Sequence, residues 1–433
     1  MYICKKYSTF AYFFTRITTA MAKTRKIIND PVFGFLSIPD GVLFDILQHP
    51  YLQRLNRIRQ LGLSFFVYPG AMHSRFLHSL GAMHLMHEAI VSLREKGVEI
   101  SENESTAAMA AILLHDVGHG PFSHVFEEAG MLADGVNHED ISLMMMEQIR
   151  DERVDKDDRE IMDLAIAIFK DEYDKHFLHQ LISSQLDVDR LDYLCRDSFF
   201  CGVTEGSVAS ARILKMMNVT DAGYLVVEAK GIYSVEKFLV ARRLMYWQVY
   251  LHHTSVAAEQ LLIKILKRAK YLTANNVGLF CSPALKYFLT SASDTQYTPG
   301  NDLLHYYSLL DDSDLLSAIK VWMNSEDKVL SELCKCFTNR QLFKGRIIDN
   351  PLSEEEYKSL CSHYAAHFGV SNQEAEYFFI EHVSTSNTYS ENGESIGILY
   401  KDGSVRDIAE ASDMLNMETL TYKPQKRYLF YLK

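Results

Sequence analysis

The most constraining feature of the chain is the segment AILLHDVGHGPFSH at residues 111–124. An apolar run, typical of a buried helix, ends in His115 and Asp116, and two glycines and a proline then break the helix. A hydrophobic core does not require an adjacent imidazole and carboxylate at such a boundary. A divalent cation does, because it needs a neutral imidazole and a carboxylate oxygen directed at one point. The segment therefore predicts a metal site.

The composition restricts what else the protein can be. With 48% hydrophobic and 23% charged residues, the 433-residue chain is typical of a globular protein with one main domain and a smaller one. Its 44 basic and 56 acidic residues give a net charge of −12, so we expect no general nucleic-acid surface. A binding site for a polyanionic nucleotide must then be built locally, from a metal and a few cationic side chains.

The cysteines and the N-terminal residues bear on the location of the protein. The seven cysteines show no zinc-ribbon or disulfide spacing, which predicts reduced thiols and a cytoplasmic location. Near the N-terminus, Arg16 interrupts an apolar run that is too short to span a bilayer, so we expect no membrane segment. A secretory signal fits poorly for the same reason. We expect residues 1–20 to be an extension or a disordered segment, and the globular chain to begin near Met21.

The periodicity of apolar residues predicts a mainly α fold. A short strand is expected at 224–231, and β-rich pieces follow Phe343, among them a hairpin around Lys401-Asp402-Gly403. We predict a main helical domain at 21–290, followed at 291–433 by an accessory region that is first helical and then α+β. The expected helices lie at residues 50–60, 75–96, 104–115, 138–150, 155–170, 175–198, 206–217 and, unbroken, 235–271.

Two further segments carry residues suited to metal chemistry. The upstream segment GAMHSRFLHSLG (70–81) contains His78, and the downstream segment DVDRLDYLCRD (187–197) contains Asp189. A single His or Asp in either place is more often structural. Together with His115 and Asp116, however, they supply four ligands for one octahedral ion and leave positions for water and phosphate oxygens. Such a set suits manganese, iron, magnesium or zinc, so the identity of the metal is left open.

The order His78, His115-Asp116, Asp189 resembles the H…HD…D pattern of the HD-domain metallophosphohydrolases. The likeness runs from about residue 26 to about 265, and the ordered set of motifs is similar to the deoxynucleoside triphosphate triphosphohydrolases. It implies an HD-domain helical fold, one divalent metal held by those four residues, and hydrolysis of a deoxynucleoside triphosphate (dNTP) to deoxynucleoside and inorganic triphosphate. The further motifs are KIINDPVFG (26–34), QRL (53–55), RQLG (59–62), YPGA (68–71) and RFLHSLG (75–81).

The resemblance also implies which residues act on the substrate. Glu127 replaces an aspartate of the family, Arg190 a lysine and Tyr246 a histidine, so contacts with the base are expected to differ. The catalytic positions are His119, His124, Glu127 and His138. The substrate-binding positions are Gln60, Leu61, Arg75, Arg190, Tyr193, Asp197, Arg242, Tyr246 and Tyr250.

Helical spacing agrees with part of this assignment. Tyr193 and Asp197 lie four residues apart and share one helix face with Asp189. Arg242, Tyr246 and Tyr250 repeat at the same spacing, although without the resemblance this stripe would be interpreted as an ordinary buried aromatic face.

The implied reaction requires a proton donor. Attack at the α-phosphorus expels the nucleoside 5′-oxygen, a poor leaving group near pH 7 unless it is protonated. A histidine is suited to this step because its pKa lies near the working pH. We assign the role to His124 and expect Glu127 to orient or tune it.

Regulation is the least determined property. Lys26, Asn29, Asp30 and Gln53 match positions near the family's allosteric nucleotide site, although Asp30 could simply cap a turn. A carboxylate that would accept hydrogen bonds from guanine is missing, so activation by GTP is left open. The resemblance further implies a homo-oligomer, either a dimer or a tetramer.

The sequence is also compatible with two functions other than a dNTP triphosphohydrolase. One is an HD hydrolase of another nucleotide or phosphate monoester, and the other is a nucleotide-sensing regulator with slow turnover. Arg54, Arg57 and Arg59 could form a local basic groove for nucleic acid, but we favour a solvated helix face for them. The sequence determines neither the base preference nor the role of the C-terminal region.

Overall fold

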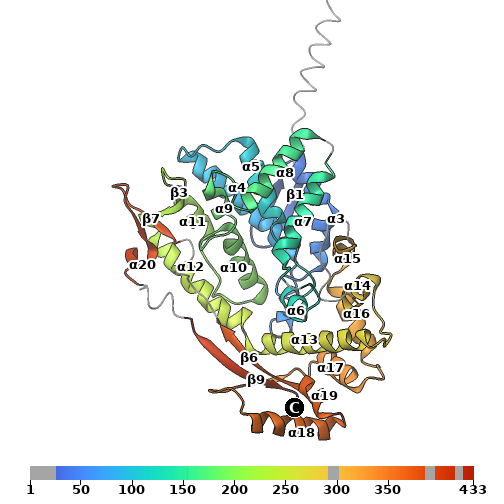
Figure 1. Cartoon of the computed structure of the whole chain (residues 1–433). Helices are drawn as coiled ribbons and strands as arrows, with labels where there is room; N and C mark the ends of the chain where they lie inside the picture. Colours follow the sequence, from blue (N-terminus) through green and yellow to red (C-terminus); the bar gives the residue numbers. More distant parts are fainter. Residues whose placement is uncertain (1–25, 134, 154, 291–301, 386–394, 415–422) are drawn as a thin grey trace, which may run out of the picture.

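The structure is a computed structural model that describes residues 26–133, 135–153, 155–290, 302–385, 395–414 and 423–433. Figure 1 shows helices throughout, with small sheets at the edges, so the prediction of a mainly α fold is confirmed. The extension expected at residues 1–20 lies outside the described residues. Within the described parts of the chain, no helix has the length and apolar character needed to cross a membrane.

The helices follow one another through the main domain and into the C-terminal region. Those up to the middle of the chain are α2 (Val42–Gln48), α3 (Pro50–Arg54), α4 (Arg75–Glu95), α5 (Glu102–Leu114), α6 (Ser123–Glu128), α7 (His138–Asp151), α8 (Lys156–Phe169), α9 (His176–Gln180), α10 (Val188–Cys201) and α11 (Ser210–Met216). The later ones are α12 (Ile232–Met245), α13 (His253–Ala274), α14 (Pro283–Thr290), α15 (Leu303–Leu309), α16 (Asp312–Trp322), α17 (Lys328–Thr338), α18 (Glu354–Phe368), α19 (Asn372–Ala375) and α20 (Ile408–Ala411).

The strands form three small sheets. The first is the antiparallel hairpin of β1 (Lys26–Asp30) and β2 (Gly34–Ile38). The second has the order β3 (Met217–Val219), β4 (Leu225–Glu228), β7 (Gly397–Leu399), β8 (Val405–Asp407). The third has the order β5 (Lys344–Ile347), β9 (Gln425–Tyr431), β6 (Phe379–Thr385). Short 3₁₀ turns are η1 (Leu55–Arg57), η2 (Ser64–Phe66), η3 (Ala229–Gly231) and η5 (Glu376–Phe378), and η4 (Tyr246–Tyr250) is a π-helical turn.

Helix α5 lies at the centre of the main domain. Ser101 caps its N-terminus: its Oγ accepts from the backbone N–H of Glu104 at 3.2 Å, while Glu104 Oε2 accepts from the N–H of Ser101 at 2.7 Å. Residues 107–114 are all buried, since α5 packs between α4 and α8. This central helix ends at Leu114 and delivers His115 and Asp116 into the interior.

The close crossing of α4 and α10 depends on Gly81. A Cβ at this position would overlap the Asp192 carboxylate and the Arg196 guanidinium, which are both fully buried. The glycine in the middle of α4 is therefore required by the approach of a buried ion pair from the neighbouring helix, although glycine lowers helix stability.

The expected unbroken helix at 235–271 is wrong. α12 ends at Met245, the π-helical turn η4 follows, and α13 begins only at His253. His252 adopts an extended backbone and caps α13, its Nδ1 accepting from the N–H of Thr254 at 3.2 Å. No proline or glycine marks this break; a side-chain cap and tertiary contacts produce it. Figure 1 shows α12 and α13 running in clearly different directions as a result.

Two other predicted helices are shorter than expected. The helix expected at 175–198 is divided into α9 and α10, because Asp187 caps α10 and accepts from the N–H of Arg190 at 2.7 Å. The helix expected at 50–60 becomes α3, which ends at Arg54, followed by the 3₁₀ turn η1.

The C-terminal region has the predicted α+β character but is closely joined to the main domain. β7 pairs in parallel with β4, and the β7–β8 hairpin turns at Gly403 with a φ of +83°, as its Asp-Gly sequence predicted. α14 and α17 pack along α13. The domain boundary near residue 290 stays a prediction, and residues 291–301 lie outside the described parts of the chain.

We expect Gly81→Ala to destabilise the protein. The added methyl group must displace the buried Asp192–Arg196 pair, and overpacking combined with a disturbed buried ion pair costs on the order of 3 kcal/mol. Thermal unfolding would measure the loss. Gly278→Ala is the matched control, because nothing lies within 4 Å of its added Cβ. Equal melting temperatures for the two variants would contradict the packing argument.

Candidate metal centre and active site

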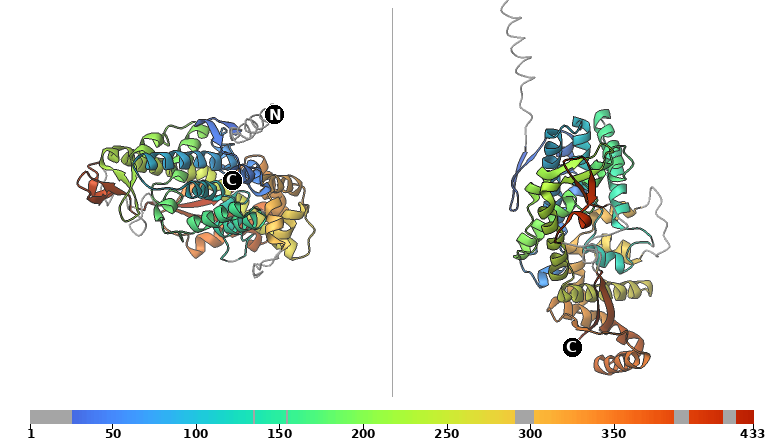
Figure 2. Two further views of the ribbon diagram at one scale, coloured as in Figure 1. Left: turned by 90° about the horizontal axis from the view of Figure 1, so that it is seen from above. Right: turned by 90° about the vertical axis from the view of Figure 1, so that its left-hand side faces the viewer.

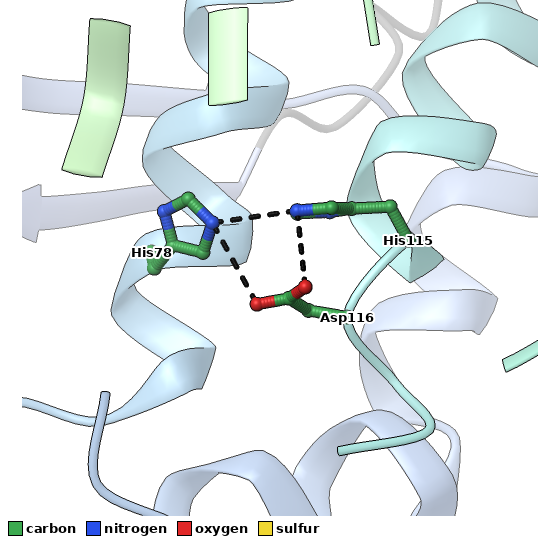
Figure 3. A group of neighbouring side chains, drawn as sticks. All are labelled: His78, His115 and Asp116. Carbon is green, nitrogen blue, oxygen red and sulfur yellow. Dashed lines mark hydrogen bonds and ion pairs between the residues drawn. The ribbon is translucent and has the colours of Figure 1, made fainter. Parts of the chain in front are cut away.

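Three helices bring the four predicted metal ligands together. Figure 3 shows His78 of α4 facing His115 and Asp116 at the end of α5. His78 Nε2 lies 3.4 Å from His115 Nε2, and Asp116 places one carboxylate oxygen 3.3 Å from His115 Nε2 and the other 3.8 Å from His78 Nε2. Asp189, in the first turn of α10, places Oδ1 at 3.0 Å from His78 Nε2 and 3.5 Å from His115 Nε2.

The hydrogen bonds behind the two imidazoles fix their orientation. His78 Nδ1 bonds Asp192 Oδ2 at 2.7 Å, and His115 Nδ1 bonds the carbonyl oxygen of Ile112 at 2.7 Å. Because both partners are acceptors, we infer that each Nδ1 carries the proton and each Nε2 presents a lone pair to the cluster. His78, His115 and Asp116 place their ligand atoms within 4.8 Å of one another, and Asp189 adds a carboxylate oxygen beside both imidazoles. This donor set fits a divalent cation, with no choice among manganese, iron, magnesium and zinc.

The electrostatics of the cluster also favour a cation. Burial lowers the pKa of His78. Asp189 and Asp192 outweigh this effect, because both form hydrogen bonds with the imidazole and both are negatively charged, and together they raise the pKa to about 10. Burial raises the pKa of Asp116, yet the charges of His115, His119 and Arg75 hold it well below its usual range. The carboxylates of Asp116 and Asp189 are therefore ionised, and they favour a positive charge at Nε2 of His78. That charge is either a proton or a metal cation that takes its place.

The loop after Asp116 is held by groups that the sequence did not reveal. Ser142 of α7 donates to the carbonyl of His115 at 2.8 Å and accepts from the N–H of Gly118 at 2.9 Å. The buried Arg54 donates to the carbonyl of Val117 at 3.2 Å, and Tyr307 of α15 donates to that of Gly118 at 2.8 Å. A Cβ on Gly118 would overlap α7, so this glycine permits the close approach. The loop is thus rigidly positioned, in part by the C-terminal region.

Beyond the cluster lie the three other predicted histidines. The rings of His119 and His138 stack with centroids 4.0 Å apart, and His124 meets them edge-on at 6.2 and 6.0 Å. Glu127 Oε1 bonds His138 Nδ1 at 2.9 Å, so the carboxylate orients His138 and not His124, which corrects the first of the two roles expected of it. Its charge still acts on His124: burial and Arg75 lower the pKa of His124, and Glu127 opposes them.

Two neighbouring cavities lie beside the cluster. The larger, of about 600 Å³, contains His115, Asp116, Asp189 and the three other histidines in its wall. The smaller, of about 380 Å³, is lined by apolar and aromatic side chains, together with Asp197 and Tyr250. Both share Gln60, Arg75, His124, Tyr193 and Tyr246 in their walls. A ligand could therefore place one end against the cluster and the other in the apolar space.

The predicted cationic residues lie around this space. Arg75 Nη1 donates to Asp116 Oδ2 at 2.5 Å, Arg190 pairs with Asp187, and Arg242 Nη1 donates to Gln185 at 3.1 Å. Arg242 is outside the walls of both cavities. Within the described residues, the Nε atoms of all three arginines and Gln60 Oε1 are buried without a hydrogen-bond partner, which suits a polar ligand.

Other predicted positions are occupied by contacts within the protein. The Tyr250 hydroxyl donates to Asp197 Oδ2 at 2.8 Å, and His73 bonds Asp197 Oδ1 at 2.8 Å. Leu61 lines the smaller cavity. His73 was not predicted; its spacing of five residues before His78 gives no signal of this role.

The smaller cavity contains a carboxyl group that sequence reasoning missed. Glu259 of α13 lines it, and no hydrogen bond or ion pair to Glu259 occurs within the described chain. Burial, then the charge of Glu128, raises the pKa of Glu259 to about 8. Because α13 was expected to continue α12 without a break, the direction of this side chain could not be predicted.

The four residues proposed for allosteric nucleotide binding make different contacts within the protein. The Asp30 carboxylate is buried and accepts hydrogen bonds from the N–H groups of Val32 and Phe33. Asp30 therefore caps the turn that follows it, which was the alternative to nucleotide binding. Lys26 lies over the ring of Phe44 at 5.4 Å, and the Gln53 side chain donates to the carbonyl of Leu47 at 2.7 Å. Asn29 is exposed on β1.

The solvated helix face favoured for three arginines is wrong. Arg54 is fully buried, Arg57 pairs with Asp311 at 2.5 Å, and Arg59 pairs with Asp312 at 3.2 Å. The two aspartates come from the start of α16 and could not be placed here from the sequence. These contacts connect the η1 segment to the C-terminal region.

Comparison with known proteins agrees with this site. A model of the HD domain matches residues 75–197, and a model of an HD associated region matches 208–278. The structure of a phosphohydrolase from Bacteroides thetaiotaomicron is similar, with 54% identity, a TM-score of 0.89, and coverage of 95% of this chain and 100% of that one. The chain therefore belongs to the HD-domain phosphohydrolases, close to the deoxynucleoside triphosphate triphosphohydrolases.

Two further relatives are similar to this chain in sequence. The uncharacterized protein YwfO of Bacillus subtilis is 36% identical over 74% of this chain and 71% of its own length. The deoxynucleoside triphosphate triphosphohydrolase SAMHD1 homolog of Dictyostelium discoideum is 32% identical over 55% of this chain. The match covers only 48% of that second relative.

We expect Glu259→Gln to stabilise the protein increasingly as pH rises. An acid whose pKa is 4.5 when unfolded and about 8 when folded retains its proton on folding, so the free energy of unfolding falls between those pH values. The slope approaches ~1.4 kcal/mol per pH unit for one full proton. Melting temperatures at pH 5 and pH 8 measure the effect. Glu88→Gln, at an exposed position of α4, is the control. The same pH dependence of the melting temperature in both variants would contradict the raised pKa of Glu259.

Proposed function

We propose that the protein hydrolyses dNTPs to deoxynucleoside and inorganic triphosphate with the help of one divalent metal ion. The observation that carries this proposal is the pair of neighbouring cavities with a shared wall. One contains the metal-ligand cluster and cationic groups, and the other is more apolar and includes tyrosines in its lining. The triphosphate would lie at the charged end and the sugar and base at the apolar end. The names of the SAMHD1-like relatives agree with this choice of substrate.

His78, His115, Asp116 and Asp189 would hold the metal, which when bound lowers the pKa of water and balances phosphate charge. Arg75 and Arg190 in the cavity wall, and Arg242 outside it, would oppose the negative charge that develops on the phosphate oxygens. Gln60 Oε1 and Tyr250 would contact the sugar, with Tyr250 held by Asp197.

The chain's own residues would supply the proton transfer. The oxygen of a water molecule bonds to the α-phosphorus, the bond to the 5′-oxygen breaks, and that oxygen takes a proton from His124. The attacking water gives up one proton to solvent, and His124 is then protonated again from solvent. Burial and the charge of Arg75 lower the pKa of His124 in the free protein. A bound triphosphate opposes the effect of Arg75, so the imidazole is more readily protonated when substrate is present. Glu127 would hold His138 beside the stacked His119.

We expect the metal-loaded protein to release intact triphosphate and a deoxynucleoside from dNTPs. Each dNTP would be supplied singly and in mixtures, with and without GTP, and the products resolved by chromatography. Pyrophosphate or monophosphate would favour an HD hydrolase of another nucleotide. Binding without turnover under any metal would favour the nucleotide-sensing regulator.

Substitutions should separate metal binding from proton transfer. We expect His124→Ala to lower kcat by about 10²- to 10⁴-fold, because it removes a general acid, while metal content is unchanged. Asp116→Asn should lose both activity and metal, because it removes a ligand. Metal content is measured by elemental analysis. Loss of metal from the His124 variant would contradict its assignment as proton donor.

We also propose a cytoplasmic protein that acts as a homo-oligomer, a dimer or a tetramer, without binding nucleic acid. The cysteines in the described residues are all free thiols, which agrees with a reducing compartment. The net charge of −12 disfavours nucleic acid as a partner.

A further inference from the structure

A row of buried charges leads from the metal ligand His78 to the surface hairpin of β1 and β2. Asp192 Oδ2 bonds His78 Nδ1 at 2.7 Å and accepts from Arg196 Nε at 2.9 Å. Arg196 Nη2 donates to the other oxygen of Asp192 at 2.9 Å, and its Nη1 donates to Asp30 Oδ2 at 2.7 Å. We call Asp30, Arg196 and Asp192 the relay.

The relay is completely enclosed. The side chains of its three members have 0% exposure, and that of His78 has 1%. In such surroundings each charge depends on its partner, because water cannot replace a lost contact. Gly81 leaves no space for the pair of Asp192 and Arg196 to shift toward α4. If Asp30 is changed, Arg196 and Asp192 must therefore change their positions or their hydrogen bonds.

The outer end of the relay is the turn of the hairpin. Asp30 Oδ1 accepts from the N–H groups of Val32 at 2.9 Å and Phe33 at 2.8 Å, so the turn sets the position of this carboxylate. Gly34 completes the turn with a φ of +80° and has open space around it. The right-hand view of Figure 2 shows the hairpin, in dark blue, at the edge of the molecule.

We propose that Asp30 and Arg196 are positioning residues for the metal ligand His78, and that the β1–β2 turn is thereby a part of the metal centre. Arg196 donates hydrogen bonds to both carboxylate oxygens of Asp192, and this fixes the oxygen that accepts the hydrogen bond from His78. Asp30 accepts a hydrogen bond from Nη1, the remaining nitrogen of the guanidinium group. The inference rests on the metal site of the proposed function, but it is independent of which nucleotide is hydrolysed.

The first test is the affinity for Mn²⁺ of the metal-free protein, measured by titration with electron paramagnetic resonance detection. We expect Asp30→Asn to bind Mn²⁺ several-fold more weakly, which is less than the roughly 10- to 100-fold loss typical when the direct partner of a metal-bound histidine, here Asp192, is removed. Asp45→Asn is the matched control, since Asp45 pairs with Arg153 at the surface and should leave the affinity unchanged. A folded Asp30 variant with an affinity within twofold of the unsubstituted protein would overturn the proposal.

General destabilisation is excluded by a second control. Leu333→Ala opens a cavity in α17, far along the chain from the relay, and lowers the melting temperature without touching a metal ligand. We expect its Mn²⁺ affinity and spectrum to be unchanged below the melting temperature. If it weakens Mn²⁺ binding as much as Asp30→Asn, stability and not positioning is responsible, and the proposal fails.

The backbone of the turn is tested without altering any charge. Gly34→Val strains a positive φ in open space, and we expect it to weaken Mn²⁺ binding several-fold. Gly403→Val strains a similar backbone angle in the β7–β8 hairpin, where φ is +83°, and we expect it to leave the Mn²⁺ affinity unchanged. Equal affinities for the two valine variants would overturn the role of the turn. If the unsubstituted protein binds no divalent metal, it is the proposed metal site that fails.

Discussion

The structure depends on holding the Nε2 atoms of two imidazoles within 3.0–3.8 Å of the carboxylates of Asp116 and Asp189 in a largely buried place. Burying such groups is costly, because each loses its hydration, unless each finds a partner in the protein or a bound cation. Partners are present: His78 bonds Asp192, His115 bonds a helix carbonyl, and Asp116 accepts from Arg75. The crossing of α4 and α10 at Gly81 and the complete burial of residues 107–114 of α5 both agree with this need.

The same constraint explains why remote segments contact the active loop. A loop whose backbone groups are buried needs a partner for each of them. Arg54, Ser142 and Tyr307 supply these partners from three separate parts of the chain. Tyr307 belongs to the C-terminal region, which thus helps to position the loop. The cavities beside the loop combine charged and apolar walls, which is the chemistry that a nucleotide requires.

Much of the fold was predictable because it depends on short-range signals. The ends of α5 follow from its Ser101 capping box and from the apolar run before His115, and the Asp-Gly turn after β7 follows from its sequence. The break before α13 was not predictable, because no proline or glycine marks it. His252 caps the helix there, and Tyr250 is tied to Asp197, 53 residues away. Contacts of that separation form only when the helices pack.

The sequence alone determined the class of protein, because the order of His78, His115-Asp116 and Asp189 carries the metal chemistry whatever the surrounding packing. It also determined a mainly helical chain. Only the tertiary structure decided that Glu127 bonds His138, that Glu259 faces a cavity, and that Asp30 belongs to a buried relay. The physical reason is that side-chain partners are chosen by proximity in three dimensions, which helix crossings, close glycine contacts and caps set together.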